Sequence, residues 1–468
     1  MRRARMAYVA AGLAAGLAAA GCLPNRVGLS PDGRTMYFSL GPQGPFGGGD
    51  RSNLYSLEIE TAEMQALTDG PGAKTWCMPA YGAKGLAYME LVGGDGEGAI
   101  RLLDLETGRD VPLTGMLQPH LYPWAIPGGA PRLLAIRKGA DAEPYWALYG
   151  EKGAAAALPL PDGATAVMGN VGVARDRFAV AVSKDVKVPG DAEGAEKEAH
   201  EYLVFLVNCA GEAAEGTQVA RWVFDDEPIV DLAFSDDGSR LVAAVLHDPA
   251  EFYELDVTDQ VAQDDSTGRA EPKRLFECPK AYYPQAAAGG GVVYLRASAA
   301  DEEWREVALW TPGEAEARVL ARLPGKLGQA YTTWRWMEDG RLRVYHLSNE
   351  GVRIIETSAD GSAATGKRLT GEHLMALARM ADFGRAAGKM PSLSEGEWPA
   401  DVAGPIGVVA EHMKKQFEES PEEIRKASES AEAAAAVWED VPAVPEIAAP
   451  AAESPAAEKP AEAPEAVP

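Results

Sequence analysis

The sequence predicts an all-β protein, a seven-bladed β-propeller of four-stranded antiparallel blades, followed by short α-helices and a disordered C-terminal tail. Three observations predict this fold. One turn-and-strand unit recurs along the chain, its recurrences are separated by multiples of one length, and a second hairpin follows it. Glycine and proline are also abundant, with 50 and 33 of 468 residues, which favours turn-rich β structure over a helical protein.

The recurring unit is clearest at residues 29–39, LSPDGRTMYFS. Pro31 fixes φ at the first corner of a turn, Asp32 can accept a hydrogen bond from the nearby backbone, and Gly33 can adopt the positive φ that closes a hairpin. From residue 35 to 39 the side chains alternate in character, which is the pattern of a strand with two different faces. The stretch therefore predicts a turn that leads into a strand.

The same unit returns twice more and sets the spacing. It reads FSDDGSRLVAAV at 234–245 and MEDGRLRVYHL at 337–347. The turn residues Asp32, Asp237 and Asp339 are separated by 205 and 102 residues, which is four and two steps of about 51. Looser turns occupy the intermediate steps and bring the predicted hairpins to seven: 82–85, 128–130, 175–177 and 289–291. Such a period with four strands per unit is typical of a propeller.

A second hairpin supplies the third and fourth strands of a blade. It is clearest at 53–68 and 100–114, where alternating apolar residues lead to a Glu-Thr turn and a strand ending in Leu-Thr. The predicted propeller covers residues 23–371. Two insertions, Lys184 to His200 and Thr258 to Glu271, are charged and glycine-rich or polar, so we expect surface loops there.

These repeated segments resemble the TolB-type, WD-like propeller repeat of bacterial envelope proteins. The segments SPDGRTMYFS, SDDGSRLVAAV and LxLETG…LT carry the resemblance, which covers most of residues 26–371. The resemblance implies a propeller fold and a place in the bacterial cell envelope. It extends to the repeat alone, so no partner-binding residue is carried over.

Residues 1–22 are predicted to be a lipoprotein-type signal peptide. A basic start precedes an apolar stretch at 7–20 that is too short to span a bilayer, and small residues run into Cys22. The segment resembles a bacterial lipoprotein signal, which implies lipid attachment at Cys22. The alternative is an ordinary secretory signal cut near Ala20. Under the usual sorting rule of such lipoproteins, Leu23 implies the outer membrane, so we expect an exported, membrane-anchored protein on the periplasmic face.

The composition changes after the propeller. Residues 372–440 are predicted to form a helical extension, with helical spacing at 373–387 and 401–418. A capping box with proline at the first helical position, at 420–423, opens a further helix through about residue 438. Residues 441–468 are nearly all proline, alanine and glutamate, which predicts a disordered tail because such a segment buries too little apolar surface to fold.

The charge argues against a nucleic-acid partner. The net charge is −26, and a polyanion needs a surface of lysine and arginine that this chain lacks. Nearly half of the excess lies in residues 391–468, which contain 17 acidic and 5 basic residues. We expect the acidic balance to serve solubility.

No catalytic or metal-binding pattern stands out, so no cofactor, metal site or catalytic residue is predicted. The sequence has no GxSxG nucleophile motif and no DxDxDG calcium loop. Three of the six histidines, His120, His247 and His346, fall in different predicted blades but at different positions relative to the turns, so they are not expected to converge. Cys77, Cys209 and Cys278 are predicted to be small buried residues, with one disulfide among them left open.

Six aromatic residues each lie a few positions ahead of a predicted first turn, which places them at one rim of the central channel. Such a rim could stack on a sugar, a peptide or a proline-rich segment, although large aromatics also fill the space between blades. The candidate ligand rim consists of Trp76, Tyr122, Trp124, Tyr283, Trp334 and Trp336.

The sequence therefore favours a non-enzymatic binding or scaffolding module of the bacterial envelope, anchored to the membrane through an N-terminal lipid. Its expected partner is an envelope protein or a glycan. One alternative is a propeller-type polysaccharide lyase or glycosidase with its active site at the channel mouth. Another is a purely structural envelope lipoprotein.

Overall fold

The computed structural model describes most of the predicted propeller and two segments C-terminal to it. The described ranges are 27–42, 44–45, 51–69, 72–80, 84–91, 98–113, 124–125, 133–137, 145–149, 155–158, 161, 163–167, 171–174, 177–189, 196–208, 215–235, 237–257, 272–299, 301, 303–325, 330–361, 364–389 and 438–444. Antiparallel strands dominate these residues, and α2 is the one α-helix among them. The predicted all-β class is therefore confirmed.

The first sheet has eight strands and consists of two antiparallel halves. A short parallel pairing joins the halves, with Arg51 opposite Gly72 and Ser52 opposite Ala73. The strands are β1 (Gly28–Leu29), β2 (Thr35–Leu40), β3 (Arg51–Glu58), β4 (Met64–Ala66), β5 (Gly72–Ala80), β6 (Gly85–Leu91), β7 (Gly98–Asp104) and β8 (Asp110–Pro112).

Two further sheets come next in chain order. One is β9 (Trp124–Ala125), β10 (Leu133–Arg137), β11 (Tyr145–Tyr149) and β12 (Ala155–Ala157). The other contains β13 (Thr165–Ala166), β14 (Gly172–Val173), β15 (Arg177–Pro189), β16 (Glu196–Asn208) and β17 (Glu215–Phe224).

Three sheets complete the set. The first is β18 (Ile229–Phe234), β19 (Leu241–Leu246), β20 (Ala250–Leu255) and β21 (Lys273–Cys278). The second is β22 (Ala281–Ala286), β23 (Val292–Ala297), β24 (Trp304–Trp310) and β25 (Arg318–Pro324). The third is β26 (Ala330–Trp336), β27 (Leu342–Ser348), β28 (Gly351–Thr357), β29 (Ala364–Thr370) and β30 (Glu439–Val441).

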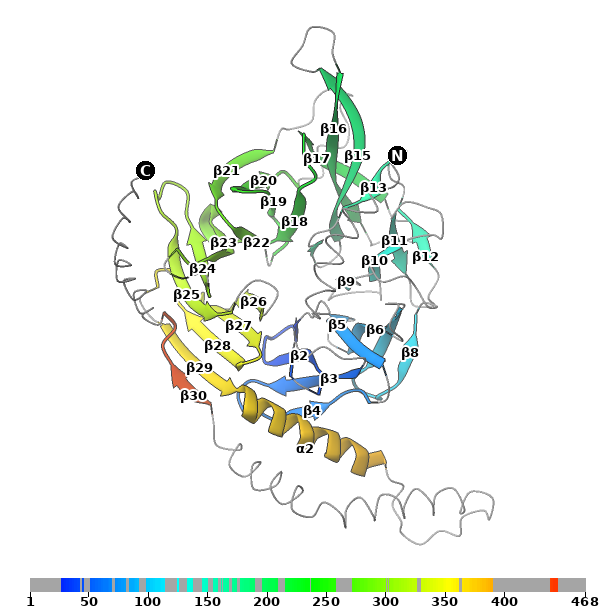
Figure 1. Ribbon diagram of the computed structural model, residues 1–468, viewed down its shortest axis with the longest axis vertical. Helices are drawn as coiled ribbons and strands as arrows, with labels where there is room; N and C mark the ends of the chain where they lie inside the picture. Colours follow the sequence, from blue (N-terminus) through cyan, green and yellow to red (C-terminus); the bar gives the residue numbers. More distant parts are fainter. Residues whose placement is uncertain are drawn as a thin grey trace, which may run out of the picture.

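The sheets succeed one another around a ring (Figure 1). First strands such as β18, β22 and β26 lie toward the centre, and last strands such as β12, β21 and β29 lie toward the periphery. Each antiparallel group presents its faces to its neighbours in the ring, which is the arrangement of a β-propeller.

The recurring turn forms as the sequence predicts. Asp32 accepts a hydrogen bond from the Arg34 backbone N–H at 3.1 Å, and Gly33 has φ of +68°. The equivalent residues Asp237 and Asp339 accept the same backbone bond, at 3.0 and 3.1 Å, from the residue two positions on. The repeated aspartate is therefore a turn former at all three sites.

The core lies between neighbouring sheets. At the junction of the last sheet with the first, Met36 and Phe38 of β2 pack in one buried cluster with Tyr345 and Leu347 of β27. A second buried cluster likewise joins two adjacent sheets, β22–β25 and β26–β28. Burial of apolar side chains between sheets therefore holds the ring together.

One predicted loop is wrong. Lys184 to His200 was expected to be a surface loop, but residues 184–189 and 196–200 continue β15 and β16 as a long antiparallel hairpin, which projects from the ring in Figure 1. Pairs across the hairpin include Lys187 with Glu196, whose side chains approach to 3.1 Å. The many charged residues favour a loop, yet Val186 and Val188 alternate with them, and backbone pairing and cross-strand ion pairs make a ribbon. The second insertion, 258–271, lies outside the described residues.

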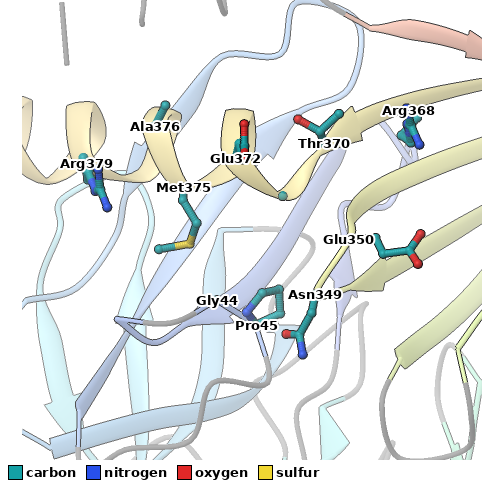
Figure 2. Close-up of a pocket in the computed structure, with 11 residues that line it drawn as sticks. Gly44, Pro45, Asn349, Glu350, Arg368, Thr370, Glu372, Met375, Ala376 and Arg379 are labelled. Atoms are coloured by element: carbon teal, nitrogen blue, oxygen red, sulfur yellow. The ribbon is translucent and has the colours of Figure 1, made fainter. Parts of the chain in front are cut away.

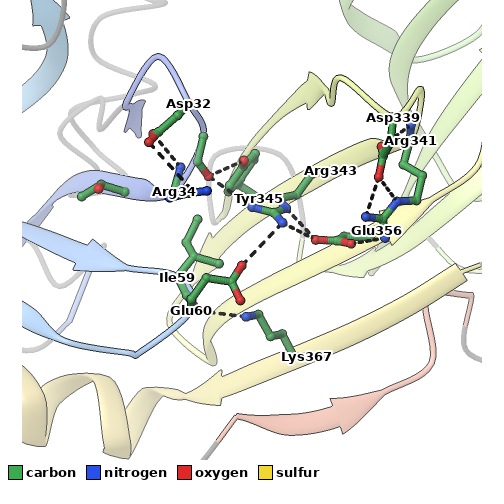
Figure 3. A network of polar contacts seen from close by, with 12 residues as sticks. Asp32, Arg34, Ile59, Glu60, Asp339, Arg341, Arg343, Tyr345, Glu356 and Lys367 are labelled. Carbon is green, nitrogen blue, oxygen red and sulfur yellow. Dashed lines mark hydrogen bonds and ion pairs between the residues drawn. The ribbon is translucent and has the colours of Figure 1, made fainter.

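The last sheet also closes the ring by polar contacts on the first turn (Figure 3). The Tyr345 hydroxyl donates a hydrogen bond to the Gly33 carbonyl at 2.8 Å, and an Arg343 nitrogen lies 3.4 Å from the same oxygen. Lys367 Nζ donates to the Ile59 carbonyl at 2.8 Å. Side chains of β27 and β29 thus hold the backbone of the first blade.

The segment after the last repeat does not continue the ring. Helix α2 (Gly371–Lys389) includes the predicted helical residues 373–387 and packs beside β4 and β29. Strand β30 pairs with β29 and replaces, at 439–441, the predicted helix end and tail start. Residues 439–441 form a strand because the edge of β29 has backbone N–H and C=O groups available for pairing. The local sequence at 439–441 does not indicate this long-range partner. The other predicted helical segments lie outside the described residues.

Candidate functional site

The predicted aromatic rim is distributed over several strands. Trp76 lies on β5 and packs against a buried cluster that joins β5–β7 to β15 and β16. Tyr283 on β22 and Trp334 and Trp336 on β26 pack against one other cluster, where Trp334 is only 8% exposed. Tyr122 and the Trp124 side chain lie outside the described part of the structure.

Three of the six candidates therefore share one inter-sheet cluster, and Trp76 lies apart from them. Burial shows that Trp334 contributes to the core. Trp76, Tyr283 and Trp336 are half-buried, so their place at a ligand rim stays a prediction.

Two of these aromatics have an unusual backbone. Trp76 and Tyr283 have φ of +54° and +53°, and each lies where the register of the first strand shifts, on β5 and on β22. The Tyr283 N–H lies 3.3 Å from an Asp231 carboxylate oxygen. A left-handed backbone is costly for a bulky residue, so the bulge must be maintained by its surroundings.

A cleft lies where α2 leaves the last sheet (Figure 2). Its volume is about 790 Å³. The β27–β28 turn, the end of β29, the start of α2 and the segment after β2 form its walls. The lining includes Asn349, Glu350, Arg368, Thr370, Glu372, Met375, Arg379 and Pro45. Met375 points from the helix toward Pro45.

Close backbone contacts fix the position of α2 at this cleft. The Gly371 N–H donates to the Glu350 carbonyl at 2.8 Å, and a Cβ at Gly371 would lie 2.5 Å from the Asn349 carbonyl oxygen. Gly351 is more constrained, because it has φ of +118° and its Cβ would lie 2.0 Å from the Leu369 carbonyl oxygen. Glycine at these positions lets the turn, the end of β29 and the helix meet.

Charge is only partly compensated in the described part of the cleft. Arg368 pairs with Glu439, and Glu350 pairs with Arg353 at 3.2 Å. Glu372 and Arg379 form no ion pair within the described residues. The cleft therefore presents one carboxylate and one guanidinium on either side of the Met375 thioether. No local sequence pattern indicates this site, because its residues come from separate parts of the chain.

The described histidines do not converge. His200 and His247 lie near carboxylates, with Nδ1 3.1 Å from Asp185 and 3.7 Å from Asp226, whereas His346 is fully buried on β27 and its Nδ1 lies 3.0 Å from the Thr332 hydroxyl. Among the residues that the structure describes, no group of three His, Cys, Asp or Glu side chains is arranged to hold a metal ion.

His346 makes the fold sensitive to acid. Burial, reinforced by the nearby Arg353 charge, lowers the pKa of His346 to about 3, against about 6.5 in an unfolded chain. As the pH falls from 7.5 to 5, His346 becomes protonated in the unfolded state but stays neutral in the folded state. We expect His346 to reduce the free energy of unfolding by about 2 kcal/mol over that range. Urea unfolding at both pH values should show a smaller acid loss for His346→Gln than for the wild type. Equal losses would contradict the assignment.

A buried lysine is a further feature that no local sequence pattern indicates. Lys74 on β5 is 2% exposed, and burial lowers its pKa although Glu90 lies 3.8 Å away. Glu90 pairs in turn with Arg101, which pairs with Asp110. The chain of charges crosses β5, β6, β7 and β8, so it ties four strands together rather than lining the cleft.

Two of the cysteines can be placed. Cys77 and Cys278 are buried free thiols in different clusters, while Cys22 and Cys209 lie outside the described ranges. In the described ranges, no helical segment has the length and hydropathy that a membrane span requires.

Comparison with known proteins gives structural similarity only. No family model matches the chain, and no curated protein sequence matches it significantly. Similar solved structures include TolB from Acinetobacter baumannii, with 11% identity and a TM-score of 0.40 over 75% of this chain and 66% of that one. A puromycin-hydrolyzing peptidase of Mycobacterium tuberculosis has 11% identity and a TM-score of 0.46, covering 75% and 53%.

An oligogalacturonate lyase from Vibrio parahaemolyticus is also similar, with 12% identity and a TM-score of 0.41 over 73% of this chain and 92% of that one. The chain spans half to two thirds of the length of TolB and the peptidase. TolB and other propeller-type proteins are thus similar to this chain, but similarity at this level says nothing about a ligand or a reaction.

Proposed function

We propose that the protein is an exported, lipid-anchored, seven-bladed propeller that acts as a non-enzymatic binding module of the bacterial cell envelope. Seven blades are supported by the two halves of the eight-stranded sheet together with the five remaining sheets. The signal-like residues 1–22 with Cys22 support the lipid anchor. The resemblance of the repeat to envelope proteins supports a location in the cell envelope.

The cleft beside α2 is the observation that carries the binding function. Its walls combine an apolar floor at Met375 and Pro45 with the charges of Glu372 and Arg379. Methionine adapts to varied apolar surfaces, and methionine and arginine are enriched where proteins contact one another. A protein segment therefore fits this cleft better than a glycan, which would favour a platform of exposed aromatic rings.

A photo-crosslinking amino acid at Met375 should capture a specific envelope protein in intact cells. The same probe at Val223, an exposed residue of β17, is the matched control and should capture none. Arg379→Glu should reduce the captured product by about fivefold or more, because it reverses a charge at the cleft. Capture from a probe at Trp336 but not at Met375 would contradict this site and favour the aromatic rim.

The enzyme alternative makes a different prediction. A polysaccharide lyase or glycosidase would release unsaturated or reducing sugar ends from a polysaccharide, and its activity would be unaffected by Arg379→Glu. Such activity in the purified protein, lost on substitution of a channel residue, would overturn the binding proposal.

The anchor has its own test. Cys22→Ser removes the thiol that would receive the lipid, so the variant should leave the membrane fraction and appear in the soluble periplasmic fraction. Labelling with a radioactive fatty acid should be lost at the same time. If Cys22→Ser sediments with membranes as completely as the wild type, the lipid anchor is wrong.

A further inference from the structure

A distant segment of the chain occupies the outer edge of the ring. Residues 390–437 separate α2 from the segment 438–444, which nevertheless lies along β29 and contributes β30 (Figure 1). The register is antiparallel, with Gly366 opposite Val441, Lys367 opposite Asp440 and Arg368 opposite Glu439. We name the residues that receive this segment the acceptor edge: Arg322, Gly366, Lys367 and Arg368.

The segment also reaches the neighbouring sheet. After Pro442, which has no N–H to extend the ladder, the Ala443 carbonyl accepts a hydrogen bond from the Arg322 N–H of β25 at 2.9 Å. Ala443 is 4% exposed and belongs to the buried cluster between β22–β25 and β26–β28. The segment therefore spans the last strands of two adjacent sheets and inserts a small side chain between them.

Two side-chain contacts define what the acceptor edge recognises. Arg368 donates from Nε and Nη2 to one carboxylate oxygen of Glu439, at 3.0 and 2.5 Å. Lys367 Nζ lies 4.7 Å from the ring centroid of Trp438, within the range of a cation–π contact. The two cations of the edge thus contact an aromatic residue and the carboxylate that follows it.

Gly366 makes the close approach possible. A Cβ at this position would lie 2.6 Å from the Val441 carbonyl oxygen and 3.1 Å from its Cγ2. Any larger residue at 366 would push β30 away from the edge. Gly366 does not line the cleft beside α2, so a substitution there separates the two sites.

We propose that the acceptor edge is a peptide-binding site that the chain fills with its own residues 438–444, and that it accepts an extended partner segment of the same chemistry. That chemistry is an aromatic residue, a carboxylate, a β-branched residue, proline and a small residue. Addition of a strand to an open sheet edge is a general mode of peptide recognition. The bound segment is exchangeable, because its ladder has three residues, its ion pair is about one third exposed, and closure of the intervening chain opposes binding.

The test uses the full chain and a fluorescent peptide with the sequence of residues 436–445. Trp438→Ala with Glu439→Ala removes both recognition contacts from the internal segment and should open the edge. We expect the opened variant to bind the peptide at least about tenfold more tightly than the wild type, whose edge is occupied. Adding Gly366→Val to the opened variant should abolish binding.

Exchanging the charges of the Arg368–Glu439 pair between the edge and the peptide provides a second test if Gly366→Val fails to fold. Arg368→Glu in the opened background should lose the peptide and bind a peptide in which the residue equivalent to Glu439 is lysine. Equal binding of the peptide to the wild type and the opened variant would overturn occupancy by the internal segment. Binding that survives both Gly366→Val and Arg368→Glu, or no binding by a folded opened variant, would overturn the acceptor edge. Crosslinking from Met375 is independent of the Gly366→Val outcome, because Gly366 does not line the cleft, whereas Arg368 does.

Discussion

Replacing Gly351 by alanine should lower the free energy of unfolding by about 3 kcal/mol or more. Gly351 has φ of +118°, a region that alanine rarely adopts, and an added Cβ would lie 2.0 Å from the Leu369 carbonyl oxygen. The overlap is with backbone, so β29 must move. Urea unfolding of the variant and the wild type measures the loss.

Gly340→Ala is the matched control in the same sheet. Gly340 also has a positive φ, +80°, but an added Cβ meets nothing within 4 Å. Gly340→Ala should lower the free energy of unfolding by about 1 kcal/mol, because only backbone strain is added. If both variants lose the same stability, the contact with β29 is not what makes glycine necessary at 351. A larger loss at 351 should be accompanied by weaker crosslinking from Met375, because the same turn positions α2.

Replacing Arg343 by methionine should cost about 3 kcal/mol, because it removes one member of a buried ion pair. Arg343 is 7% exposed and lies 2.5 Å from Glu356, and it also approaches Glu60 and the Gly33 carbonyl of the first turn (Figure 3). In the variant, the negative charges of Glu356 and Glu60 lose a neighbouring positive charge at the point where the ring closes. Thermal and urea unfolding should both report the loss.

Arg341→Met is the control for this closure. Arg341 contacts the same Glu356 carboxylate at 2.5 Å, but its side chain is 43% exposed to water, which screens the pair. It should shift the unfolding midpoint only slightly. A loss at Arg341 as large as that at Arg343 would show that the Glu356 charge, and not burial at the closure, determines the effect.

The repeat could be predicted because its turns are local. An aspartate that binds the backbone two residues on, with glycine at positive φ, requires only four or five consecutive residues, and Asp32, Asp237 and Asp339 all form it. The regular spacing of these turns then predicts successive sheets along the chain. The same reasoning fails for Lys184 to His200, where alternation of Val186 and Val188 with charged residues was the available signal for a hairpin.

The cleft and the acceptor edge could not be predicted, because both depend on long-range contacts. Arg379 and Pro45 line one cleft although they lie far apart in the sequence, and Glu439 pairs with Arg368 across 71 residues. A capping box at 420–423 favours a helix up to Trp438, and nothing local indicates that the chain then changes to a strand. Trp76, Tyr283 and the pair Trp334 and Trp336 lie on first strands, but their place at a ligand rim stays a prediction, and burial of Trp334 depends on a neighbouring sheet.

The closure of the ring has a consequence for the order of folding. The turn at Gly33 is among the first parts of the propeller to be made, yet its partners Arg343 and Tyr345 lie 310 and 312 residues further along the chain. Contacts of such sequence separation form slowly, and until they form the first blade keeps an open face toward its missing neighbour. Because the amino-terminal residues are synthesised first, the chain carries an incomplete first blade throughout synthesis, and that face is fully covered only when the last blade has been made.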